Sequence, residues 1–150
     1  NNITNINALE GLYNLSTLIF SQNNISNISC LYGLTKIRHL DISMNKKIIS
    51  LTGVQNMKML ECIICDFCGI YSLIELQGNS NIRKISIESN NLDSIDDILT
   101  MENLKELNIK YNKINKYQFN KRYINYITSY FFSREDSIVE KLKSLDFLEK

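Results

Sequence analysis

The sequence predicts an α/β solenoid, in which short parallel β-strands are stacked, joined by return segments and closed by a helical cap. Three observations predict this fold. A unit of 22 residues repeats along the chain, and one segment of each unit alternates apolar and polar residues with a period of two. The repeat then ends after Asn112, where an aromatic-rich segment follows. A chain of 150 residues has room for one short array and no obvious room for two globular domains.

The repeat is marked by one position in each unit, which we call the landmark. The landmark residues are Asn1, Asn23, Asn45, Cys68, Asn90 and Asn112, at offsets of 22, 22, 23, 22 and 22 residues. Apolar residues recur at fixed distances after each landmark. In the unit from Asn45 this series is moved by one residue, which places an insertion at Lys46 or Lys47. The unit from Cys68 has one polar residue in the apolar series, Asn79.

The alternating segment of each unit predicts a half-exposed β-strand. In the first unit Leu18 and Phe20 are expected to face inward, whereas Thr17, Ile19 and Ser21 face outward. Parallel strands stack about 4.8 Å apart, so each inward residue packs against its counterpart in the next unit. An inward asparagine at the landmark can bond the backbone where the chain bends. We therefore expect a one-dimensional core with an asparagine ladder at its edge.

Five copies of one motif can be read in the same frame. They are "LSTLIFSQNNI" from Leu15, "IRHLDISMNKKI" from Ile37, "LECIICDFCGI" from Leu60, "IRKISIESNNL" from Ile82 and "LKELNIKYNKI" from Leu104. The motif resembles the leucine-rich-repeat pattern L-x-x-L-x-L-x-x-N/C-x-L. The 22-residue unit is similar to the class shared by the protein phosphatase 1 regulatory subunit, axonemal dynein light chain and bacterial internalins. This resemblance implies a right-handed superhelix with a parallel concave sheet, acting as a non-catalytic protein-binding module or scaffold.

The repeat frame divides the chain into two regions. Residues 1–115 form the array, with about five repeats and a start in mid-repeat, and residues 116–150 form a capping region. Because an uncapped solenoid end exposes apolar surface, we expect further N-terminal sequence or another chain to cover the first repeat. A helix can open at Asp136 or Ser137 with an apolar face behind it. "KLKSLDF" from Lys141 also resembles the C-terminal cap of intracellular members of this class.

The outward positions of the strands predict the binding surface. Exposed apolar residues beside charged ones are typical of a protein interface, although single exposed apolar residues are also common. The predicted partner-binding residues are His39, Asp41, Ile64, Asp66, Phe67, Lys84, Glu88, Glu106, Lys110 and Tyr111.

Catalysis and cofactor binding are not indicated. His39 beside Asp41 has no nucleophile fixed by the pattern, and the chain has no Gly-rich phosphate loop. Cys62, Cys65 and Cys68 are evenly spaced, as metal ligands can be. The frame nevertheless places Cys62 outward and Cys65 inward, so the three thiols cannot converge. We predict no enzyme activity, no metal and no cofactor, with Cys62 as the one candidate reactive or interface thiol.

Charge and cysteine usage bear on partner and location. The formal net charge is +1, which does not favour nucleic acid or an anionic membrane, and no segment is long and apolar enough to insert into a bilayer. We predict a protein partner and no small-molecule substrate. Bunched cysteines favour a reducing compartment. An intracellular regulatory or assembly subunit, cytoplasmic or nuclear, is the first hypothesis. An extracellular internalin-like adhesion module is the alternative, for which Asn-x-Ser/Thr sequons at Asn2, Asn14, Asn24 and Asn27 are the best hint.

Overall fold

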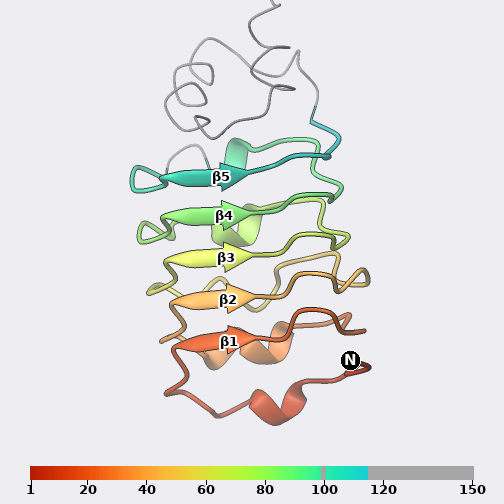
Figure 1. Cartoon of the computed structure of the whole chain (residues 1–150). Coiled ribbons are helices and arrows are strands. Elements are labelled where there is room, and N and C mark those ends of the chain that lie inside the picture. The colour runs from red at the N-terminus through yellow and green to blue at the C-terminus, as the bar shows by residue number, and fades with distance from the viewer. Residues whose placement is uncertain (99–100, 115–150) are drawn as a thin grey trace, which may run out of the picture.

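Five short strands form one parallel sheet in chain order in the computed structural model (Figure 1). The strands are β1 (Thr17–Ile19), β2 (His39–Asp41), β3 (Cys62–Ile64), β4 (Lys84–Ser86) and β5 (Glu106–Asn108). The structure describes residues 1–98 and 101–114. The predicted cap, 116–150, lies outside the described residues.

The predicted register of the sheet is confirmed residue by residue. Thr17, His39, Cys62, Lys84 and Glu106 are paired across the five strands. The middle residue of each strand points into the core, and the side chains of Leu40, Ile63 and Ile85 are at most 1% exposed. Strand pairing therefore follows the alternation of apolar and polar residues, because a slip by one residue would turn every apolar side chain toward solvent.

The predicted asparagine ladder is also present. The amide of Asn45 donates to the carbonyls of Phe20 (3.1 Å) and Ile42 (2.9 Å), and its Oδ1 accepts from the Ile25 amide at 3.0 Å. Asn23, Asn90 and Asn112 make equivalent bonds. Each rung satisfies backbone groups of its own repeat and of the preceding one, so the ladder ties consecutive turns together.

The helical component of the described array is made of 3₁₀ turns. These are η1 (Asn7–Leu9), η2 (Ser29–Gly33), η3 (Ile74–Leu76) and η4 (Asp96–Ile98). The apolar residues of the return segments recur every three residues, as Ile25, Ile28, Leu31 and Leu34 do. This spacing matches the three residues per turn of a 3₁₀-helix better than the 3.6 of an α-helix.

Each return segment begins with a short polar side chain that bonds the backbone two residues on. Asn27 Oδ1 accepts from the Ser29 amide (2.7 Å), and Ser72 Oγ accepts from the Ile74 amide (3.2 Å). The corresponding positions Asn5, Ser50 and Ser94 do the same. These side chains replace part of the missing hydrogen bonding at the start of each turn.

Glycines mark two kinds of position on the return side. Gly11 and Gly78 have positive φ, which suits the turns that they form, whereas Gly33 ends η2. Gly53, which sequence reasoning did not single out, has φ +120, and a Cβ there would lie 2.3 Å from the Ile28 carbonyl oxygen. Only glycine fits at residue 53, because the backbone of the preceding repeat passes against it.

The insertion after Asn45 forms a tight turn in which the Ile48 amide donates to the Asn45 carbonyl at 2.9 Å. In the flanking repeats the equivalent amides, those of Ile25 and Ile70, donate instead to the landmark asparagine of the following repeat. For Ile48 that landmark is Cys68, which has no amide oxygen. The turn therefore supplies the Ile48 amide with an acceptor that a cysteine at position 68 does not provide.

Candidate functional site

The residue before each landmark has a left-handed backbone. These residues are Gln22, Met44, Phe67, Ser89 and Tyr111, with φ between 55 and 58. The amides of the first four continue the parallel ladder beyond the strands, as when Phe67 N donates to the Glu88 carbonyl at 2.8 Å. Bulky residues rarely adopt this conformation, which costs about 1–2 kcal/mol for an L-residue. Three of the five positions nevertheless carry large apolar or aromatic side chains.

These large side chains are exposed beside the sheet. Phe67 is 44% exposed, Met44 46% and Tyr111 78%. Ile19, in the second outward column, is 61% exposed, and Ile64 in the same column is half-buried. The outward surface of the sheet, with these left-handed residues at its border, is called the sheet face below. It consists of the outward strand positions at which the sequence predicted the binding surface.

All ten residues of the predicted site occupy the sheet face or its border. His39, Lys84 and Glu106 share the first outward column, and Asp41 is paired with Ile64 in the second. Asp66, Glu88 and Lys110 follow the ends of β3, β4 and β5, each just before a left-handed residue. Their role in binding stays a prediction.

A polar network that the sequence did not reveal joins the middle of the sheet face. The Ser86 hydroxyl lies 2.7 Å from Asp66 Oδ1 and 3.0 Å from Oδ2, and the Glu88 amide donates to Asp66 Oδ1 at 2.7 Å. Asn108 Nδ2 donates to Glu88 Oε2 at 3.0 Å. Ser86 is only 8% exposed, although it was expected to face outward, because it lies beneath this network.

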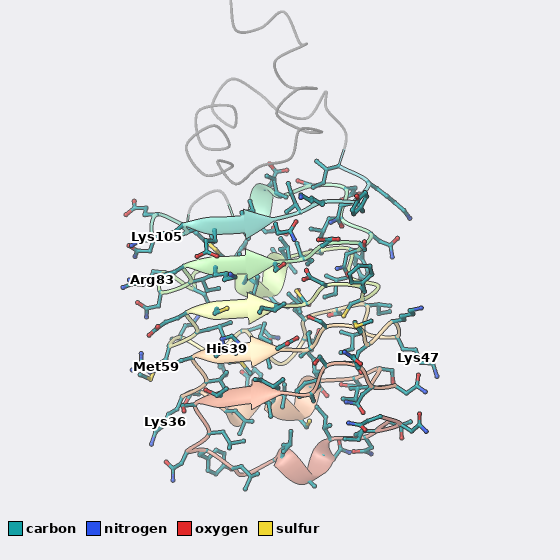
Figure 2. The ribbon with its side chains drawn as sticks, in the orientation of Figure 1. Lys36, His39, Lys47, Met59, Arg83 and Lys105 are labelled. Atoms are coloured by element: carbon teal, nitrogen blue, oxygen red, sulfur yellow. The ribbon has the colours of Figure 1, made fainter. Side chains whose placement is uncertain are left out.

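Several basic side chains lie at the edge of the array where the chain enters the strands, away from the polar network (Figure 2). Figure 2 shows Lys36, Arg83 and Lys105 on the side where the loops lead into the strands, and Lys47 at the opposite side. Arg38, which directly precedes β2, forms an ion pair with Glu61. A second ion pair joins Lys84 and Glu106 in the first outward column of the sheet face, with 2.6 Å between Nζ and Oε2. The Glu106 carboxylate raises the pKa of Lys84.

The cysteines behave as buried or half-buried thiols. Burial raises the pKa of Cys65, and it raises that of Cys68 to about 11. Cys68 occupies the landmark as predicted and donates to the Ile42 carbonyl at 3.4 Å. Burial also raises the pKa of Cys62, with a smaller opposing effect of Lys84. Cys62 is therefore a protonated thiol at neutral pH, which favours its role as an interface residue over a reactive one.

Among residues 1–98 and 101–114, no group of three His, Cys, Asp or Glu side chains is placed to hold a metal ion. No helix in these ranges combines the length and apolar character that crossing a membrane requires.

Comparison with known proteins agrees with this geometry. The family described as Leucine Rich repeats (2 copies) matches residues 13–56. An internalin (inlF) from Listeria monocytogenes has a TM-score of 0.73 and 26% identity over 75% of this chain and 33% of its own. Internalin C2 (inlC2) from the same organism has a TM-score of 0.74 and 26% identity, over 77% of this chain and 50% of its own. A leucine-rich-repeat protein from Leptospira interrogans shares the fold at 17% identity, with a TM-score of 0.69. No curated protein matches the sequence.

The fold and the repeat define the class: the described array is a leucine-rich-repeat solenoid, and residues 13–56 match the family model. This array is structurally similar to the leucine-rich-repeat domains of internalins, and it spans a third to a half of the length of those internalin chains. Domains of this class are typically non-catalytic and generally bind proteins through the concave face.

Proposed function

We propose that this chain is a non-catalytic interaction module that binds a protein partner on the sheet face. The observation that carries the proposal is the exposure of Met44, Phe67 and Tyr111 at left-handed positions. Each side chain is unfavourable twice over in the free protein, because glycine or asparagine fits the backbone at lower cost and a polar group fits the solvent better. Burial of these side chains by a partner would offset the free-energy cost of exposing them in the free protein.

Two cellular settings are compatible with this proposal. An intracellular regulatory or assembly subunit, cytoplasmic or nuclear, is supported by free thiols at Cys30, Cys62, Cys65 and Cys68. An extracellular recognition module is supported by the likeness to internalins at 26% identity. Fractionation of cells that express the tagged full-length protein separates them. Recovery at the cell surface or in the medium favours the second setting, and recovery in the cytosol or nucleus favours the first.

Glycine substitution separates binding from stability. Phe67→Gly removes the side chain and relieves the left-handed strain, while it adds conformational entropy to the unfolded chain. We expect a free energy of unfolding equal to or up to about 1 kcal/mol above wild type. We also expect recovery of the protein partner in a pull-down to fall at least about tenfold, since an aromatic side chain that acts as a hot spot of an interface is worth about 2 kcal/mol or more.

The matched control is Tyr32→Ala. Tyr32 is 56% exposed in η2, on the return side of the array and away from the sheet. Its loss should leave partner recovery unchanged. Undiminished recovery by a folded Phe67→Gly protein, or an equal loss with Tyr32→Ala, would show that the sheet face is not the binding surface.

A further inference from the structure

We propose that the middle of the sheet face binds an arginine or lysine side chain of the protein partner. The carboxylate of Asp66 would bind its cationic group, with the carboxylates of Asp41 and Glu88 nearby, and Ile64 and Phe67 would pack against the rest of the side chain. We name Asp41, Asp66 and Glu88 the acidic centre. This inference rests on the proposed function and adds the chemistry of the partner's central residue.

The carboxylates of the acidic centre form no ion pair in the described part of the chain, although Lys84 lies near enough to Asp66 for that carboxylate to help raise the lysine pKa, and Lys110 follows Glu88 in the same column. Within residues 1–98 and 101–114 the ion pairs are Arg38 with Glu61 and Lys84 with Glu106. Neither involves the acidic centre. The cations shown in Figure 2 at the start of the strands lie along another edge. Asp66 and Glu88 follow neighbouring strands in one column, with backbones about 5 Å apart, and Asp41 lies on the strand before them, two positions earlier. Like charges this close repel one another, and a cation beside them relieves the repulsion.

The carboxylates are held in place by neutral donors. Asp41 Oδ1 accepts from the Ser43 amide at 2.9 Å, and Asp66 accepts from the Ser86 hydroxyl and the Glu88 amide. Asn108 fixes Glu88. These bonds orient the oxygens without removing their charge. A partner that brings a positive charge therefore meets a preorganised acceptor set and orders few side chains on binding.

An unpaired buried hydroxyl lies among these groups. Ser43 is 9% exposed, and its Oγ has no hydrogen-bond partner. Strand alternation places Ser43 on the same face as Asp41, which comes two residues earlier, and in the same column as Asp66. A buried polar group without a partner costs about 1–3 kcal/mol. An incoming guanidinium or ammonium group has donors to spare for this hydroxyl.

The apolar border selects an organic cation rather than a metal ion. Phe67 directly follows Asp66 and is 44% exposed, so a guanidinium that reaches the carboxylate can lie over its ring. Ile64 offers apolar surface two residues before Asp66. In the described ranges no group of three ligand side chains is placed for a metal. A long basic side chain uses both parts of the surface.

A displayed library of random peptides provides a defined probe. The full-length chain is used to select binders, and the affinity of the enriched peptides is measured by fluorescence anisotropy. We expect one position enriched in arginine or lysine. We also expect Asp66→Asn, which keeps an oxygen acceptor for Ser86 and Glu88, to weaken binding about tenfold or more. Replacing the peptide's basic residue by glutamine should weaken its affinity for the wild-type protein by the same factor. The same replacement should not weaken its affinity for the Asp66→Asn protein any further.

The controls are Asp93→Asn and Glu102→Gln, exposed acids outside the sheet face, which should leave affinity within about twofold. Peptides that lose binding with Phe67→Gly but show no basic enrichment, or bind Asp66→Asn normally, overturn the inference and leave the proposed function standing. Peptides that tolerate both Phe67→Gly and Asp66→Asn, or a library without any binder, overturn the proposed function with it.

Discussion

Asn45 and Asn79 are both buried amides, in opposite energetic situations. At the landmark, Asn45 is fully buried, with its donor and acceptor atoms bonded to backbone groups. Asn79 stands in the apolar series of the return segment and is 1% exposed, with neither amide atom bonded. Its counterparts in the neighbouring repeats are Met57 and Met101, both buried. The same side chain therefore stabilises one bend and destabilises another part of the core.

Replacing Asn79 by leucine should stabilise the protein. Leucine has the same branched shape and no polar atoms to leave unpaired, so we expect the free energy of unfolding to rise by about 1–3 kcal/mol in urea denaturation. Asn45→Leu is the matched control and should lower it by a similar amount or more, since it leaves backbone groups unpaired. A loss of stability in Asn79→Leu would show that the amide has a partner, such as a buried water.

The thiol of Cys68 gives stability a pH dependence. Burial raises its pKa from the ordinary value of 9.0 to about 11. The folded chain therefore keeps a proton that the unfolded chain releases. Its contribution is fully present below pH 9 and is lost as pH rises from about 9 to 11. We expect the free energy of unfolding of wild type to fall more steeply over this window than that of Cys68→Ser, which does not titrate. Equal slopes would contradict burial of the thiol.

The element that departs from the regular repeat is the turn at Lys46 and Lys47. Its internal bond from Ile48 to Asn45 stands in for the bond that an asparagine at 68 would accept. Without the insertion, the Ile48 amide would point to the next landmark residue, as the amides of Ile25 and Ile70 do when they donate to Asn45 and Asn90. Turn length and landmark identity are therefore expected to be coupled.

A double-mutant cycle measures this coupling. Deletion of Lys47 alone should leave the Ile48 amide without an acceptor, and Cys68→Asn alone should bury an amide oxygen without a donor. Each change should lower the free energy of unfolding by about 1–3 kcal/mol. Together they should cost less than the sum of the two by about 1 kcal/mol or more. Additive effects would mean that the insertion and the cysteine are unrelated.

At the scale of the whole molecule, the array is a stack in which each repeat contacts its neighbours. Its register could be predicted because the column from Thr17 to Glu106 sits between apolar columns, and a slip would expose all of them. The 3₁₀ character of η1 to η4 had a signal as well, namely the three-residue spacing of apolar positions.

Other features had no sequence signal of their own. The left-handed backbone at Phe67 and Tyr111 could not be predicted, because neither position carries the glycine or asparagine that usually indicates it. The bonds of Asp66 to Ser86 and Glu88 depend on side-chain rotamers, which a column of outward residues does not fix. The sequence therefore located the sheet face, while the acidic centre and the unpaired Ser43 hydroxyl required coordinates.

Site-specific photo-crosslinking tests binding by the sheet face most directly. A photoreactive phenylalanine analogue is placed at position 67 or, as a matched control, at position 32 in the full-length chain, and each protein is irradiated with its partner. We predict a covalent adduct from position 67 on the sheet face and none from position 32 in η2. An adduct from position 32 with none from position 67 would contradict binding on the sheet face.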